Sequence, residues 1–177
     1  MAAYNASYAN RGQWLEKVIN MSNIVYGNKN IAVIKKVPTP TSPIRRGKEI
    51  VGMKYTEKST VDFVGVSRGT FIAFDAKETK TKNLPFKNIE NHQLDYLQTT
   101  SDHGGHCFLL IYFDAFKKCY KVMIHDYVKA FEQHASAGRK SIPYAWFEAN
   151  AAEVKSNNGA PLDYLGDLEP HHDKENQ

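Results

Sequence analysis

The sequence predicts a single α/β domain. A segment with helical periodicity comes first, a series of strand-like segments follows it, and the second half alternates between helix and strand patterns. A chain of 177 residues is long enough for one domain with a hydrophobic core and too short for two. A hydrophobic fraction of 42% and a mean hydropathy of −0.52 fit a soluble globular protein. We expect the domain to span residues 1–165, with a polar, disordered tail over 166–177.

The first predicted helix begins after Asn10, a residue type suited to an N-cap, and ends near Ser22. Glu16 lies on this helix. Residues 30–37 are mostly apolar and β-branched, which predicts a strand. The apolar face of the helix is expected to consist of Trp14, Leu15, Val18, Ile19 and Met21.

A segment with three prolines follows this strand. Pro38, Pro40 and Pro43 each lack a backbone N–H, so they exclude both a helix and a central strand. The segment must therefore project as a stalk-like loop over about residues 38–54 before the chain returns near Val51–Tyr55.

Two strands are predicted over residues 61–77. Arg68-Gly69 suits the turn of a β-hairpin between them. A hairpin centred on this turn places Asp62 directly across from Asp75.

The second strand carries an Asp-x-Lys motif. Because strand side chains alternate, Asp75 and Lys77 share one face while Phe74 and Ala76 point into the core. Hard cations such as Mg²⁺ take oxygen ligands, so Asp62, Asp75 and a backbone carbonyl could hold one together with substrate phosphate. A lysine beside the metal can orient or stabilise an attacking water. The pattern therefore favours a metal-dependent phosphodiesterase over a pair of strands with merely solvated charges.

The second half of the chain is predicted to contain a helix, two strands and a second helix, in that order. A helix over about 90–102 precedes a strongly apolar strand at 107–113. A second strand near 119–124 leads into a helix at about 125–136. The remainder, from Gly138, is expected to be loop-rich.

Charge is distributed unevenly along the chain. The last 15 residues carry a net charge of −4, so residues 1–162 carry +8. Between Lys35 and Lys58 there are seven basic residues and two acidic ones. Such an asymmetry beside a phosphodiesterase motif indicates a polyanionic partner.

Other sequence features indicate an intracellular protein. No apolar run approaches the length of a membrane span, and the first residues do not resemble a secretion signal, so we expect a cytoplasmic location. Cys107 and Cys119 are too few for a disulfide framework and match no zinc motif. We expect both to be reduced core residues.

Several spaced motifs carry a family resemblance over about residues 4–165. In chain order they are Tyr8-Ala9-Asn10-Arg11-Gly12, Ile31-Ala32-Val33-Ile34-Lys35-Lys36, the Ser59–Gly65 strand, Ala76-Lys77-Glu78-Thr79-Lys80, Asn91-His92-Gln93 and Gly138-Arg139-Lys140-Ser141-Ile142. This series resembles the RecU family of Holliday junction resolvases, with a viral or mobile-element homologue as one interpretation. The resemblance implies a restriction-endonuclease-like PD-(D/E)xK core, in which a mixed central β-sheet is flanked by helices.

The resemblance also implies an activity and a set of site residues. RecU proteins act as homodimers that place paired symmetric nicks in four-way DNA junctions, with Mg²⁺ as the cofactor and Mn²⁺ as a substitute. The metal ligands would be Asp62, Asp75 and the Ala76 carbonyl. The other catalytic residues would be Lys77, Gln93, Glu16 and Thr60.

Basic residues in the matched segments are the candidate DNA contacts. A dimer with two positive stalks could enter the open centre of a four-way junction. The stalk candidates are Arg45, Arg46, Lys48 and Lys54. The remaining candidates are Arg11, Lys35, Lys36, Lys80, Lys82, Arg139 and Lys140.

This sequence departs from the family pattern in two ways. RecU proteins commonly have glutamate where this chain has Asp75, and the stalk is shorter here. Two alternatives stay open at this point. One is a related endonuclease that cuts other branched or duplex DNA, and the other is a junction-binding protein that does not cleave.

Overall fold

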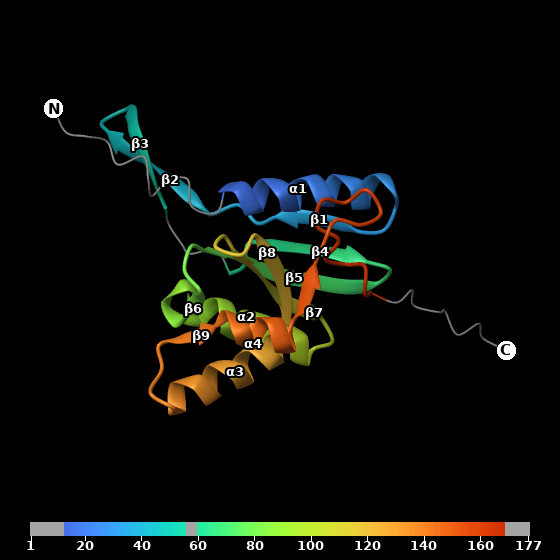
Figure 1. The fold of residues 1–177 in the computed structure, drawn as a ribbon. Coiled ribbons are helices and arrows are strands. Elements are labelled where there is room, and N and C mark those ends of the chain that lie inside the picture. The colour runs from blue at the N-terminus through green and yellow to red at the C-terminus, as the bar shows by residue number, and fades with distance from the viewer. Residues whose placement is uncertain (1–12, 56–59, 169–177) are drawn as a thin grey trace.

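The computed structural model describes residues 13–55 and 60–168, which form a mixed α/β domain (Figure 1). The helices are α1 (Gln13–Asn28), η1 (Phe86–Asn88), α2 (Asn91–Asp102), α3 (Ile124–Ser136) and α4 (Tyr144–Asn150). The strands are β1 (Val33–Lys36), β2 (Thr41–Arg46), β3 (Glu49–Tyr55), β4 (Phe63–Ser67), β5 (Thr70–Thr79), β6 (Asn83–Pro85), β7 (His106–Phe113), β8 (Lys118–Met123), β9 (Ser141–Pro143) and β10 (Ala152–Val154).

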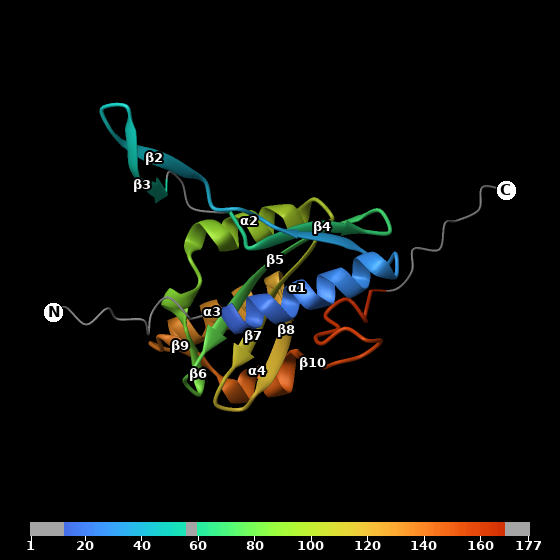
Figure 2. The same cartoon turned by 90° about the horizontal axis from the view of Figure 1, so that it is seen from above.

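Six strands make the central sheet, in the order β1-β4-β5-β7-β8-β10. Strands β5 and β7 are parallel and the other neighbours are antiparallel. Helix α1 covers one face of the sheet, and α2, α3 and α4 lie on the other, as Figures 1 and 2 show. The predicted α/β class, with a mixed central sheet between helices, is confirmed.

Helix α1 extends further than predicted, and its buried face differs from the expected one. Leu15, Ile19 and Tyr26 are buried, at spacings that keep them on one side of the helix. Met21 is 57% exposed, so its assignment to the apolar face was wrong, while Trp14 is 48% exposed. Trp14 nevertheless packs on the sheet, because its ring lies 4.4 Å from that of Tyr112 on β7, measured between centroids.

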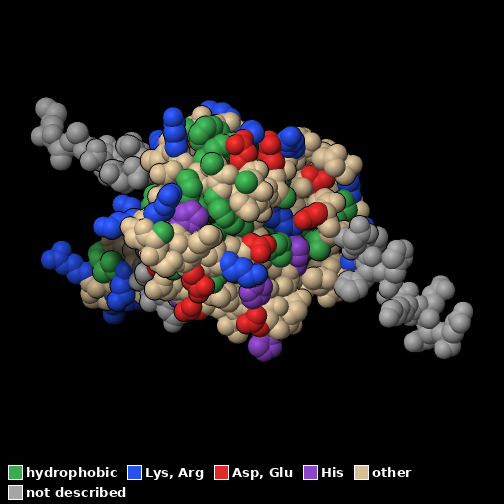
Figure 3. Space-filling view, turned by 60° about the horizontal axis from the view of Figure 1, so that its bottom comes forward, with side chains coloured by type: hydrophobic (Ala, Val, Ile, Leu, Met, Phe, Trp, Pro, Cys, Tyr) green, Lys and Arg blue, Asp and Glu red, His purple; other side chains and the backbone are tan. Residues whose placement is uncertain are grey.

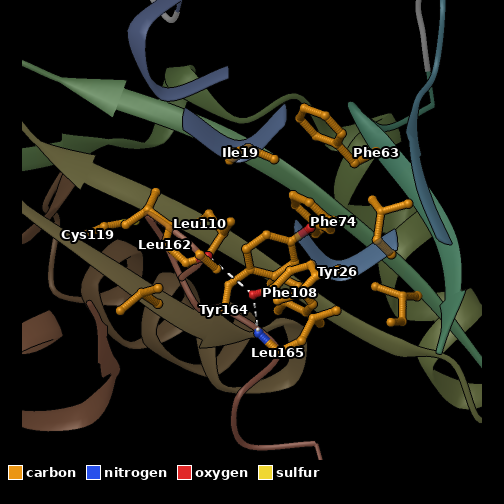
Figure 4. Close-up of a cluster of buried hydrophobic side chains, with 14 of the residues drawn as sticks. Ile19, Tyr26, Phe63, Phe74, Phe108, Leu110, Cys119, Leu162, Tyr164 and Leu165 are labelled. Carbon is orange, nitrogen blue, oxygen red and sulfur yellow. Dashed lines mark hydrogen bonds between the residues drawn. The ribbon is translucent and has the colours of Figure 1, made fainter. Parts of the chain in front are cut away.

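The core beneath α1 is built on stacked aromatic rings (Figure 4). The ring centroids of Phe63 and Phe74 are 4.9 Å apart, and those of Phe74 and Phe108 are 4.8 Å apart. Tyr164 packs against Phe74 and lies edge-on to Tyr26. These contacts fix the strand that carries the Asp-x-Lys motif, because Phe74 immediately precedes Asp75.

The C-terminal part of the domain is more ordered than predicted. It forms β9, α4 and β10, and residues 160–168 then return to cover the core. Asp167 pairs with the buried Lys121 at 2.6 Å, so the expected boundary after residue 165 was drawn too early. Of the predicted disordered tail, residues 169–177 lie outside the described part of the chain.

The stalk is a β-hairpin and not a loop. Strands β2 and β3 form a separate two-stranded sheet that projects from the domain (Figures 1 and 2). Pro43 lies within β2, opposite Met53. A two-stranded ribbon has only edge strands, which can accommodate a proline where a central strand could not. The segment therefore projects from the domain as predicted, but it is a two-stranded ribbon and not a loop.

The remaining elements agree with the sequence within a few residues at their ends. Strand β1 is shorter than the predicted 30–37, and the N-cap candidate Asn10 lies outside the described residues. Cys107 and Cys119 are free and buried, as predicted. Among the described helices none is long and apolar enough to cross a membrane.

Candidate active site

The β4–β5 hairpin has the predicted register. Its turn residues Arg68 and Gly69 have φ angles of 47° and 80°, the positive values that a type I′ turn requires. Continued one residue beyond β4, the register places Asp62 opposite Asp75. The two carboxylates of the sequence motif therefore meet at one end of the sheet.

Asp75 is the buried centre of the site, with a fully buried side chain. Its Oδ1 accepts a hydrogen bond of 2.9 Å from Gln93 Nε2. Its Oδ2 forms a close ion pair with the Lys77 ammonium group and has no other polar partner among the described residues. Asp75 and Lys77 thus lie on the same face of β5, as the alternation of side chains predicts.

Asp62 is held chiefly by backbone groups. Its Oδ2 accepts a hydrogen bond of 3.0 Å from the Ala76 N–H, and its carbonyl accepts one of 2.9 Å from the Val37 N–H. The distance from Asp62 Oδ2 to Lys77 Nζ is 4.0 Å, and the Asp62 side chain is 34% exposed. The sequence analysis did not identify the Ala76 and Val37 amides as partners of Asp62, because side-chain patterns carry no information on backbone donors. Only the pairing register of the strands could have indicated them.

The electrostatics of the site favour a bound cation. Burial raises the pKa of Asp75, the Lys77 ammonium opposes this rise, and the Asp62 carboxylate adds to it. A positive charge placed between the carboxylates would stabilise both in the ionised form. Carboxylate and carbonyl oxygens are the ligands that Mg²⁺ prefers, and Mg²⁺ usually keeps several waters. Asp62, Asp75 and the Ala76 carbonyl therefore fit such an ion, although no cluster of three or more His, Cys, Asp or Glu occurs among the described residues.

Gln93 connects the site to helix α2. Its Nε2 donates to Asp75, while its Oε1 accepts a hydrogen bond of 3.3 Å from the Glu90 N–H at the start of the helix. The side chain is buried, with 8% of its residue surface exposed. Gln93 thus orients Asp75 with its amide nitrogen, while its amide oxygen is held by the backbone of Glu90.

The other two predicted catalytic residues, Glu16 and Thr60, lie on segments that precede β4 in the chain. Glu16 pairs with Lys36 at 2.7 Å, and Lys36 is opposite Phe63, whose side chain lies in the core under α1. Asp75 faces the other side of the sheet. Thr60 is exposed at a bend before β4. Among the described residues, no hydrogen bond or ion pair joins Glu16 or Thr60 to the two aspartates or to Lys77.

The predicted DNA contacts are mostly exposed and fall into two groups. Figure 3 shows Lys and Arg side chains over the projecting hairpin, with hydrophobic side chains among them. The four basic residues of this hairpin are exposed, and β1 leads into it. Strands β6 and β9 pair, which brings the segment after β5 beside the segment after α3. The first group is Lys35, Lys36, Arg45, Arg46, Lys48 and Lys54, and the second is Lys80, Lys82, Arg139 and Lys140. Arg11 lies outside the described residues.

Comparison with known proteins gives consistent matches over most of the chain. The RecU family model, described as Recombination protein U, matches residues 10–169. The Holliday junction resolvase RecU of Geobacillus sp. strain WCH70 is 35% identical over 173 residues, covering 94% of this chain and 86% of the relative. The protein of the same name from Levilactobacillus brevis is 34% identical over 168 residues, covering 91% and 84% of the two chains.

A solved structure is also similar. It is that of Archaeoglobus fulgidus Hjc, a Holliday junction resolvase from an archaeal hyperthermophile. Its TM-score is 0.48 and its sequence identity 14%, over 80% of this chain and 95% of that chain.

Proposed function

Because the chain belongs to the RecU family, we propose that it is a Holliday junction resolvase, an endonuclease that nicks four-way DNA junctions. The observation that carries this proposal is the convergence of Asp62, Asp75 and Lys77 at one end of the sheet. A family member without cleavage activity would have no need to bury a carboxylate beside a lysine at this cost.

We propose that the nuclease requires Mg²⁺, with Mn²⁺ able to substitute. When bound, such an ion lowers the pKa of a water ligand and offsets charge on the phosphate. Asp62 and Asp75 would hold the ion together with the Ala76 carbonyl. The Lys77 ammonium group lies where it can orient the attacking water and stabilise its hydroxide form. Gln93 holds Asp75 in place and does not itself need to touch the substrate.

We propose that the projecting hairpin recognises the junction. It is a narrow, cation-bearing ribbon outside the main domain, which suits entry into the open centre of a branched DNA. Replacing Arg45 and Arg46 by alanine should lower junction affinity more than linear-duplex affinity. Equal losses on both substrates would mean that these side chains make only generic phosphate contacts.

We propose that the active form is a homodimer, because two opposed strands must be nicked. Sedimentation of the protein with junction DNA should give two protomers per junction. One protomer per junction would overturn this part of the proposal.

The decisive experiment compares cleavage of a synthetic mobile four-way junction with cleavage of matched linear and flap DNA. Wild type and Asp75→Ala are assayed with Mg²⁺ or with EDTA. Paired symmetric nicks that disappear with EDTA and in the variant would establish a resolvase that uses this site. Preferential cutting of flap or linear DNA would identify a different branched-DNA or duplex nuclease. Binding without cleavage in either Mg²⁺ or Mn²⁺ would identify a junction-binding protein.

A further inference from the structure

Asp62 lies just outside strand β4, which begins at the next residue. The β1–β4 ladder pairs Lys36 with Phe63, and its next step is the hydrogen bond from the Val37 N–H to the Asp62 carbonyl, at 2.9 Å. Pro38 follows and has no N–H to donate. Among the described residues, no N–H between Val37 and β2 donates to the chain around Asp62, so the Val37 amide is the last such donor before the hairpin begins.

Asp62 is therefore fastened from both neighbouring strands. The Val37 amide holds its carbonyl from the β1 side, and the Ala76 amide holds its carboxylate from the β5 side at 3.0 Å. Strand β4 lies between β1 and β5 in the sheet. The Lys77 ammonium group is 4.0 Å from the same carboxylate, too far for a hydrogen bond. The Ala76 N–H, and not the lysine, is the hydrogen-bond donor to this carboxylate, and the Val37 N–H holds the main chain of the same residue.

We propose that Val37 is a positioning residue for the metal ligand Asp62. Its backbone N–H holds the main chain of Asp62 so that the carboxylate stays at the cation site. This inference rests on the proposed metal-dependent nuclease activity and adds to it a residue at the base of the hairpin.

The surroundings of Val37 suit a fixed donor. Its side chain is partly buried against the core cluster that contains Val61, which is fully buried. As the residue before Pro38, it is restricted to extended backbone conformations. The direction of its N–H is therefore set before any ligand binds. The chain also leaves the domain for the DNA-binding hairpin directly after Val37, so the hairpin and Asp62 share this anchor.

The test replaces the amide of Val37 with an ester, by incorporating the α-hydroxy analogue of valine. This change deletes the N–H and keeps the side chain. The matched control is the same replacement at Ile31, whose N–H donates to the Tyr26 carbonyl, also at 2.9 Å, before the start of β1. Both variants lose one backbone hydrogen bond of equal length, but only one of these bonds reaches Asp62.

Three quantities are measured on each protein. They are the single-turnover cleavage rate of a four-way junction across a Mg²⁺ titration, the junction dissociation constant in EDTA, and the Mn²⁺ affinity by calorimetry. We expect the ester at Val37 to lower the rate by about tenfold at limiting Mg²⁺ and to weaken Mn²⁺ binding by a similar factor. Junction affinity should stay within about twofold, and excess Mg²⁺ should restore part of the rate. The ester at Ile31 should leave all three values within about twofold of wild type.

Two results would overturn the inference. One is an unchanged cleavage rate and Mn²⁺ affinity with the ester at Val37. The other is an equal loss with both esters, in proportion to reduced thermal stability, which would make the bond merely structural. If the wild type cut no junction, the proposed function would fail, and Mn²⁺ calorimetry alone would still decide the role of Val37.

Discussion

Replacing Lys77 by methionine should destabilise the domain in a pH-dependent way. The lysine forms an ion pair with Asp75, whose side chain is fully buried, while 19% of the lysine side chain is exposed. Removing one partner of a buried pair costs about 3–5 kcal/mol, and the partial exposure of Lys77 favours the lower limit, about 3 kcal/mol at pH 8. Methionine keeps most of the apolar stem, so packing contributes little to this loss.

The pH dependence follows from the pKa of Asp75. Burial raises it, and removing Lys77 removes the largest opposing influence. When the pKa of a carboxyl group is higher in the folded state than in the unfolded state, the folded state binds the proton more tightly. The stability of the fold therefore falls as the pH rises above the ordinary pKa of an aspartate. At pH 5 the free energy of unfolding of the variant should therefore be only about 1 kcal/mol below that of wild type. At this pH Asp75 can take up a proton, and a neutral carboxyl group does not need the Lys77 ammonium group as a partner.

Urea denaturation in EDTA at pH 5 and pH 8 measures both values. The control is Lys117→Met, which removes an exposed lysine and should leave the urea midpoint nearly unchanged at both pH values. The Lys77 variant should also lose cleavage and keep junction binding. A loss of stability that is equal at the two pH values would refute the reasoning, because it could not come from the charge on Asp75.

Three further predictions concern other buried polar groups. Gln93→Met removes the hydrogen bond to Asp75 and should lower the cleavage rate by about 10- to 100-fold with unchanged junction affinity, measured under single turnover. Asp167→Asn leaves the Lys121 ammonium buried without its carboxylate and should cost about 1–2 kcal/mol, whereas Lys121→Met should cost less, as urea denaturation would measure. Burial and the nearby Lys121 lower the pKa of His106 to about 4, so stability should fall as pH drops from about 6.5 toward 4. His106→Gln should flatten that part of the stability profile.

The hairpin that carries the site was predictable because its determinants are local. A turn with Arg68 and Gly69 fixes the register, and strand alternation then assigns each side chain to a face. The positions of Asp62, Asp75 and Lys77 follow from these two rules alone. The structure brings the three together as that reasoning requires.

The burial pattern of α1 and the C-terminal segment depend on long-range packing and were predicted less well. Tyr164 fills a space between Phe74 and Tyr26, which are far from it in the sequence. No local pattern shows that residues 160–168 will return to the sheet. Turn-forming and polar residues in this segment indicated a loop, and the aromatic contact that orders it could be recognised only from the fold.

The form of the β2–β3 hairpin could not be predicted from its sequence for a different reason. Its prolines correctly excluded a place in the central sheet, but they do not exclude a two-stranded ribbon. Pro43 pairs in register with Met53, and the exposed Ile44, Ile50 and Val51 give the ribbon strand-forming side chains. The side chains of this segment therefore favoured strands, whereas its prolines argued against them. Pairing of two edge strands is compatible with both.

The family resemblance led us to expect a glutamate at position 75, and the structure shows how an aspartate is held there. The shorter Asp75 carboxylate stays within the buried layer of β5, and two long side chains reach it there. Gln93 extends from helix α2 to one oxygen, and Lys77 extends along β5 to the other. The position of the Asp75 carboxylate therefore depends on Gln93 and Lys77, so the proposed cation site would depend on these two residues as well as on its two carboxylates.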